Sequence, residues 1–159
     1  MEYILKNILT LLQDSMHNVL LIILWNLCLY LLHRLTHITP VLKNLHRKHH
    51  VYVLTNDTGW HWNNLFLYND NLEGTLDLWI TDVLPTIVFC FIFNAWWIFV
   101  FYWVWAAFLQ ENFEHNKHIN FSGLTMGRWH LEHHRTPSHN FGLFIPIWDK
   151  LFRTEKCVQ

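Results

Sequence analysis

Ten of the thirteen histidines in this sequence stand in four short clusters, which read HRLTH, HRKHH, EHNKH and WHLEHH. Within each cluster the histidines are three or four positions apart, a spacing that places side chains on one face of a helix. Two or three imidazoles on one helix face can bind the same metal ion, so the clusters predict a metal centre. The candidate ligands are His33, His37, His46, His49, His50, His115, His118, His130, His133 and His134.

The number of imidazoles predicts two metal ions rather than one, because ten ring nitrogens exceed the four ligands of a tetrahedral zinc ion. Without metal, these neighbouring imidazoles would have to stay neutral or repel one another, and folding gains nothing evident from that arrangement. Imidazole binds zinc, copper, nickel and iron, so the ligand type alone leaves the metal open. The three other histidines, His17, His61 and His139, are interpreted as ordinary polar residues.

Three acidic residues lie near the clusters, and two of them, Glu111 and Asp149, are further candidates. Glu111, His115 and His118 follow the helical spacing 0, 4 and 7, so Glu111 is expected either to bind a metal or to orient a histidine from outside. Glu114 is expected to point elsewhere on that helix. Asp149, in the stretch WDKLF, is a candidate to steady a ligand. For each acid the alternative is an ordinary role: a solvated or capping acid for the two glutamates, a loop hydrogen bond for Asp149.

The elements that position these residues must include membrane helices. At 159 residues the chain has the length of one domain, residues 1–159, yet 52% of it is apolar, more than a small core can bury. Val19–Leu32 and the 27-residue run Val83–Leu109 carry no charge, and a run of that second length is typical of a membrane segment. No small-residue cleavage site follows Leu32, so we expect the first segment to be retained. The formal net charge of −1 argues against a nucleic-acid partner.

The distribution of basic residues predicts the orientation. Ten of the eleven lysines and arginines lie at Arg34 or later, near the histidine clusters, which places the clusters on the cytoplasmic face. Residues 51–82 are too polar to cross, so the run Val83–Leu109 must enter the membrane and return if the clusters are to meet. Asn94 and Ala95 mark the expected bend, leaving arms of about 17 and 22 Å against a hydrocarbon core of about 30 Å. We therefore predict a re-entrant helical hairpin; the alternative is one long tilted span.

The other elements are predicted from capping signals and apolar spacing. The stretch YILKNILTLL predicts a shallow helix, and Asp14 or Ser15 is expected to cap a second helix that reaches about His37 and stops before Pro40. The stretch NLEGTLDLWITD predicts an interfacial helix with one apolar face, formed by Leu72, Leu76, Trp79 and Val83. The expected fold is an all-α membrane protein, with one N-terminal transmembrane helix, a short re-entrant helical hairpin and a cytosolic helical cap that carries the histidine clusters.

This location limits the chemistry. A metal centre at the rim of a membrane, floored by apolar helices, has access to lipid chains, whose C–H bonds offer no handle for acid–base attack. Chemistry on such bonds needs a redox metal and oxygen, and zinc is redox-silent. The sequence thus favours iron.

The clusters and the end of the chain together resemble the fatty acid hydroxylase and sterol desaturase superfamily, whose members carry HxxxH, HxxHH and a later HxxHH. The matching stretches are HRLTH, HRKHH, WHLEHH and the closing NFGLFIPIWDKLFRT, from about His33 to Thr154. Related hydroxylases have a histidine about fifteen positions before the last HxxHH, where His115 stands, so the resemblance ranks His115 above His118. The stretch NFEHN is also similar to NYxEHYG of membrane alkane hydroxylases. Arg153 stands where the superfamily has glycine.

The resemblance implies a di-iron, O2-dependent hydroxylase or desaturase acting on fatty acyl or sterol C–H bonds, with zinc able to replace iron in the isolated protein. Electrons must come from a separate donor, a cytochrome b5 or a ferredoxin, because the chain has no HPGG stretch and only five glycines. Two alternatives stay open: a membrane protein that holds zinc without redox chemistry, and a carotenoid hydroxylase.

Overall fold

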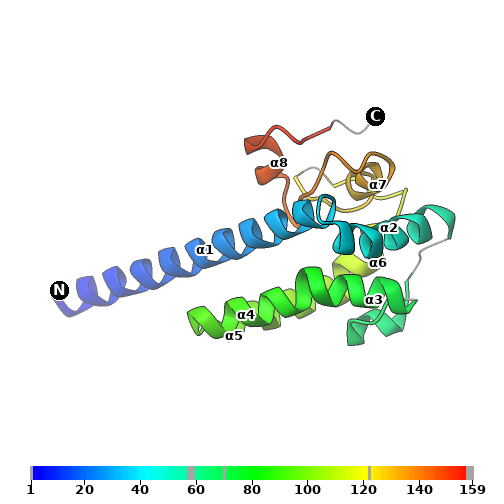
Figure 1. The fold of residues 1–159 in the computed structure, drawn as a ribbon. Coiled ribbons are helices and arrows are strands. Elements are labelled where there is room, and N and C mark those ends of the chain that lie inside the picture. Colours follow the sequence, from blue (N-terminus) through cyan, green and yellow to red (C-terminus); the bar gives the residue numbers. More distant parts are fainter. Residues whose placement is uncertain (1, 57–59, 70, 122, 157–159) are drawn as a thin grey trace.

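The computed structural model describes residues 2–56, 60–69, 71–121 and 123–156, and every regular element within those ranges is a helix (Figure 1). This confirms the all-α fold class. Two elements, η2 and η3, are π-helical turns, and η1 is a 3-10 helix. The elements are α1 (Glu2–Thr36), α2 (Pro40–Thr55), η1 (Trp62–Phe66), α3 (Leu72–Leu78), η2 (Trp79–Val83), α4 (Leu84–Phe93), α5 (Trp96–Val104), η3 (Trp105–Gln110), α6 (Glu111–Phe113), α7 (Arg128–Arg135) and α8 (Ile147–Leu151).

Helix α1 is one continuous helix of 35 residues, so the predicted break and cap at Asp14 or Ser15 are wrong. The Ser15 hydroxyl instead donates to the carbonyl of Leu11, 2.7 Å away and one turn earlier, and this bond lets the residue stay inside the helix. As predicted, the helix ends before Pro40, which begins α2. At 1.5 Å per residue α1 is about 52 Å long, more than the thickness of a hydrocarbon core.

The apolar run after residue 83 folds into a helical hairpin, with the bend at the predicted place. Asn94 ends α4 in the left-handed conformation, with φ of 48°, and α5 begins at Trp96. The run is therefore two helices, and the alternative of one long span is wrong. Both outer ends of the hairpin point toward the end of α1 that carries its C-terminus, whereas the bend lies toward the other end (Figure 1).

The first arm of the hairpin is longer than predicted, because α3 runs through η2 into α4 and forms one helix of 22 residues from Leu72 to Phe93. In η2, the Leu84 N–H donates to the Trp79 carbonyl five residues earlier. This wider turn comes just before Pro85 and accommodates a residue that lacks an N–H. The arm is about 33 Å long, so the argument that both arms are too short to cross is wrong for this arm.

The stretch predicted to form an interfacial helix is helical, as α3. Leu72, Leu76 and Trp79 are exposed on one face, as expected, but Val83 is fully buried. The π turn adds a residue to the helical repeat and rotates Val83 away from the other three. By length and composition, the helices Tyr3–Thr36 and Leu72–Phe93 are each long and apolar enough to cross a membrane.

Trp25 of α1 packs against both helices of the hairpin. Its side chain is 1% exposed, and its indole N–H donates to the Thr86 hydroxyl of α4 at 3.0 Å. The indole also packs edge-on against Tyr102 of α5, with ring centroids 6.0 Å apart. The outer surface of the hairpin is apolar and exposed, as at Phe91 and Val100, which suits contact with lipid.

The C-terminal segment packs against α1 just before the first histidine cluster. The Trp148 indole N–H of α8 donates to the Asn26 side-chain oxygen at 2.9 Å, and the Tyr30 and Thr154 hydroxyls lie 2.8 Å apart. Because Asn26 and Tyr30 lie in the turns of α1 before His33, these contacts hold the first histidine cluster against the end of the chain.

Candidate metal centre

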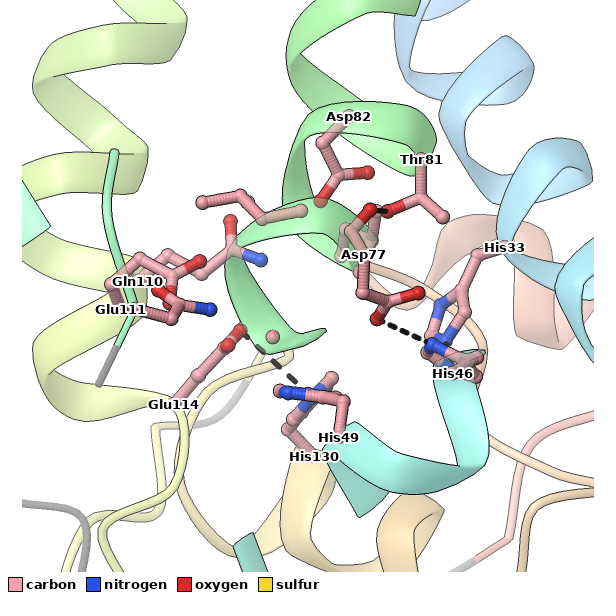
Figure 2. A pocket seen from close by; sticks show the side chains of 14 residues that line it. His33, His46, His49, Asp77, Thr81, Asp82, Gln110, Glu111, Glu114 and His130 are labelled. Carbon is pink, nitrogen blue, oxygen red and sulfur yellow. Dashed lines mark hydrogen bonds and ion pairs between the residues drawn. The ribbon is translucent and has the colours of Figure 1, made fainter. Parts of the chain in front are cut away.

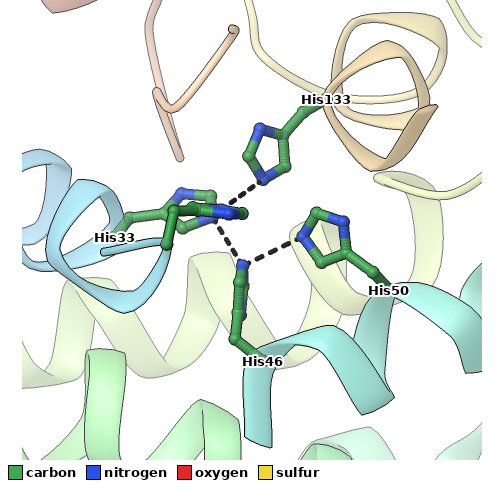
Figure 3. Close-up of side chains that lie close together, drawn as sticks. His33, His46, His50 and His133 are labelled. Atoms are coloured by element: carbon green, nitrogen blue, oxygen red, sulfur yellow. Dashed lines mark hydrogen bonds between the residues drawn. The ribbon is translucent and has the colours of Figure 1, made fainter. Parts of the chain in front are cut away.

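Nine of the ten candidate histidines converge in space and form two groups. Within each group, one ring nitrogen of every member lies within 4.8 Å of those of all the others. The side chains come from α1, the turn after it, α2, the turn after α6, and α7, and four of the first group are labelled in Figure 3. The five-histidine group is His33, His37, His46, His50 and His133; the four-histidine group is His49, His115, His130 and His134.

The two HxxHH clusters each serve both groups. In α2, His46 and His50 are four residues apart and face the five-histidine group, whereas His49 faces the four-histidine group. In α7, His133 faces the five-histidine group, whereas His130 and His134 face the four-histidine group. Three histidines at i, i+3 and i+4 thus reach two neighbouring metal positions from one helix.

The ring nitrogens approach one another at the spacing of ligands on a shared ion. The Nε2 atom of His46 lies 3.1 Å from that of His33 and 3.0 Å from that of His50. In the four-histidine group, the Nε2 atoms of His115 and His134 are 3.2 Å apart. Two nitrogens bound to one ion at about 2.1 Å and at right or tetrahedral angles are separated by roughly 3.0–3.4 Å.

Hydrogen bonds on the far side of the rings decide which nitrogen carries the proton. Nδ1 of His33 lies 2.8 Å from the Phe141 carbonyl oxygen, and Nδ1 of His46 lies 2.7 Å from the Asp77 carboxylate. A carbonyl or carboxylate oxygen only accepts, so each Nδ1 donates. In the neutral rings, the Nε2 lone pairs of His33 and His46 therefore face each other at 3.1 Å with no proton between them. A metal cation between the lone pairs resolves this repulsion, so the residues fit a bound metal.

The rings are held in the neutral form that binds metal. Burial lowers the pKa of His37 to about 3, with repulsion from His33 and Lys43 adding to it. Burial likewise lowers the pKa of His49 to about 4. For His50, burial and the charges of neighbouring histidines lower the pKa to about 2. These imidazoles remain unprotonated near neutral pH.

Asp149 supports His33 indirectly, through the backbone of Phe141. Its carboxylate accepts the backbone N–H groups of Phe141 at 2.8 Å and Gly142 at 2.7 Å, and the Thr154 hydroxyl at 2.7 Å. The Phe141 carbonyl in turn accepts the bond from His33. A Cβ at position 142 would lie 2.7 Å from the Asp149 Oδ2 atom, so only glycine allows this close approach.

Glu114, and not Glu111, reaches the histidines. One Glu114 oxygen lies 3.4 Å from Nε2 of His115. The other lies 4.0 Å from Nε2 of His130 (Figure 2). Glu111 belongs to neither histidine group. Helix α6 ends at Phe113, so the helical spacing behind the prediction does not extend to His115 and His118. Burial raises the pKa of Glu114 to about 7, and a hydrogen bond from Gln110 opposes that rise.

His118 lies outside both groups and is exposed, in the loop that follows α6. Its predicted place among the ligands depended on a helix reaching residue 118, and that helix ends earlier. We therefore leave His118 out of the ligand set.

Sequence reasoning missed Asp77 and misplaced Glu114. Both side chains are buried, at 5% exposure each. For Asp77 the available signal was an ionisable residue in a helix that leads directly into the long apolar run, because such a residue is costly to bury and usually has a functional partner. Asp77 has that partner in His46.

A small cavity adjoins both groups, between the histidines and the helices α3, η2 and η3 (Figure 2). Its volume is about 30 Å³, enough for roughly two water molecules or a diatomic molecule. The cavity leaves a space beside the imidazole rings that is lined mainly by polar side chains. Its titratable lining residues are His33, His46, His49, His130, Asp77, Asp82, Glu111 and Glu114.

Comparison with known proteins identifies the family of this chain. The fatty acid hydroxylase family matches residues 18–154, which include all four histidine clusters. The chain belongs to the fatty acid hydroxylase family. It is also 26% identical, over 132 residues, to the Delta(7)-sterol 5(6)-desaturase of Leptosphaeria maculans. That alignment covers 79% of this chain and 33% of the desaturase, so the chain spans about a third of that relative's length. No solved structure matches the chain.

Proposed function

We propose that this member of the fatty acid hydroxylase family is a membrane-bound, di-iron, O2-dependent hydroxylase or desaturase that acts on fatty acyl or sterol C–H bonds. The observation that carries the proposal is the convergence of nine buried and half-buried imidazoles into two groups beside apolar helices. The family match and the sterol desaturase relative support a lipid substrate.

The arrangement of the helices supports an orientation in the membrane. The hairpin begins and ends near the histidine groups, and its outer surface is apolar. We propose that α1 and the hairpin lie in the bilayer and that the histidine clusters lie at its cytoplasmic face, as the basic residues beside the clusters indicate. A lipid chain in that bilayer would reach the metal centre from the hydrocarbon side.

Two iron ions held by the five-histidine and four-histidine groups would supply the activation of O2 and the removal of hydrogen from an unactivated carbon. The chain's own residues prepare that chemistry. The carbonyl of Phe141 and the carboxylate of Asp77 keep protons on Nδ1 of His33 and His46, so Nε2 stays free for the metal. Burial keeps the imidazoles neutral and the hairpin shields the centre from bulk water.

Electrons would come from a separate donor, a cytochrome b5 or a ferredoxin, as the glycine-poor sequence suggests. Exposed basic residues of α2, including Arg47 and Lys48, lie on the helix that carries the second histidine cluster. Such residues favour the approach of an acidic donor by long-range attraction.

Lipid profiling tests the proposal. Cells that express the chain with an electron donor should contain at least one oxygenated or newly unsaturated fatty acyl or sterol species, which disappears in His130→Ala and His49→Ala. The matched control is His118→Ala, which removes an exposed imidazole outside both groups and should keep the product.

Two results would reject the proposal. One is a product that persists in both His130→Ala and His49→Ala. The other is a wild-type chain that carries its metals and receives electrons but changes no lipid; bound zinc in that case would favour the alternative of a non-redox zinc protein.

A further inference from the structure

The two histidine groups are unequal, because one has five imidazoles and the other has four with a buried carboxylate beside them. We propose that Glu114 is the fifth ligand of the ion in the four-histidine group. One ion would then have nitrogen ligands alone, and the other would have four nitrogens and a carboxylate oxygen. This inference rests on the proposed di-metal centre and adds a ligand to it.

The distances place Glu114 beside a metal rather than in a hydrogen bond. Its oxygens lie 3.4 Å from Nε2 of His115 and 4.0 Å from Nε2 of His130. A strong hydrogen bond between an imidazole nitrogen and a carboxylate oxygen spans about 2.7–3.2 Å. Ligands on opposite flanks of one ion, each bound at about 2.0–2.2 Å, are about 3–4 Å apart. The carboxylate thus faces the histidine nitrogens across a gap of the size that an ion fills.

The electrostatics also favour a cation near Glu114. The side chain is 5% exposed, and its ion-pair contacts, among the residues that the structure describes, are with histidines and not with lysine or arginine. The cavity beside it is lined by further acids, Asp77, Asp82 and Glu111. An ionised carboxylate in such surroundings is costly unless a positive charge lies close to it, and the neutral rings of the group supply none.

The two groups also differ in the hydrogen bonds to Nδ1, the ring nitrogen that faces away from the ion. In the five-histidine group, an acid acts from outside, because Asp77 accepts a hydrogen bond from Nδ1 of His46. In the four-histidine group, Nδ1 of His130 and Nδ1 of His134 are buried without a hydrogen-bond partner in the described part of the chain. The acid of this group instead faces the Nε2 side, where the ion would lie.

Cobalt titration of the metal-depleted, full-length protein in detergent tests the inference. Wild type should bind two Co²⁺ ions per chain. In Glu114→Gln the second ion should bind at least tenfold more weakly, and its visible absorption should change because an oxygen ligand is lost. Glu111→Gln is the matched control, because Glu111 is a neighbouring acid of the same cavity that lies outside both groups. It should keep both ions and the wild-type absorption.

Two ions bound to Glu114→Gln with wild-type affinity and absorption would overturn the inference. Should that variant fail to fold, infrared difference spectra of wild type and Glu111→Gln with and without Co²⁺ decide the matter. A shifted carboxylate stretch in both supports coordination, and an unshifted one refutes it. The outcome is separable from the proposed function: a chain that oxidises lipid but gives wild-type cobalt binding in Glu114→Gln refutes only this ligand, whereas altered cobalt binding without lipid oxidation refutes only the function.

Discussion

The hydrogen bond between Asp77 and His46 allows a quantitative test of how the metal centre is supported. The bond is 2.7 Å long and both side chains are buried, so it is a charge-assisted hydrogen bond shielded from water. Asp77→Asn keeps the shape of the side chain and an oxygen acceptor but removes the charge. A bond to a charged group contributes about 1.5–3 kcal/mol and a neutral one about 1 kcal/mol, so the expected loss is about 0.5–2 kcal/mol. This loss corresponds to roughly twofold to thirtyfold weaker metal binding.

A competition titration with a chelator of known affinity measures the effect. Because two ions bind, the titration is best run in a His134→Ala background, which removes a ligand of the four-histidine group and leaves the five-histidine group to report. Asp82→Asn is the control, since Asp82 is a similarly buried acid on the same helix, at 8% exposure, that lines the cavity. Equal affinity in wild type and Asp77→Asn, or an equal loss in Asp82→Asn, would refute the reasoning.

Three further predictions follow from local geometry. His118→Ala should retain two metal ions per chain by elemental analysis, because His118 is exposed and outside both groups; loss of an ion would restore it as a ligand. Arg153→Gly should raise the free energy of unfolding by about 0.5–1 kcal/mol in a denaturant titration, because Arg153 has φ of 57°, where a side chain is strained and glycine is not; a lower free energy would contradict this. With the native cysteines replaced, Asn94→Cys should resist a membrane-impermeant maleimide added to either side, whereas Lys117→Cys on the cap should react from the cytoplasmic side; ready labelling of Asn94→Cys from the far side would show that the bend emerges there.

Much of the metal centre could be predicted from the sequence because a helix fixes the relative directions of side chains three or four residues apart. His46, His49 and His50 lie within one helix and all reach the metal centre, although His49 joins the four-histidine group and the other two join the five-histidine group. The bend at Asn94 was also predictable, because a polar residue interrupts an apolar run and asparagine tolerates the left-handed conformation.

The failures came where the helical repeat changes. A π turn at Trp79–Val83 and another at Trp105–Gln110 each add a residue to the repeat, and simple spacing rules do not foresee them. The first turn rotated Val83 away from the exposed face of α3. The choice of Glu111 over Glu114 failed because it assumed a helix from Glu111 to His118, whereas α6 ends at Phe113. Asp77 was missed for a different reason, since its partner His46 lies 31 residues earlier and meets it only through the packing of α2 on α3.

The central claim is that nine imidazoles form two metal sites, and the metal content of purified protein tests it most directly. Wild type, loaded with Fe²⁺ without oxygen and freed of excess metal, should contain two ions per chain by elemental analysis. His50→Ala, from the five-histidine group, and His134→Ala, from the four-histidine group, should each lose most of one ion and retain the other. A wild-type chain that holds one ion or none, or two variants that both keep two tightly bound ions, would contradict the account.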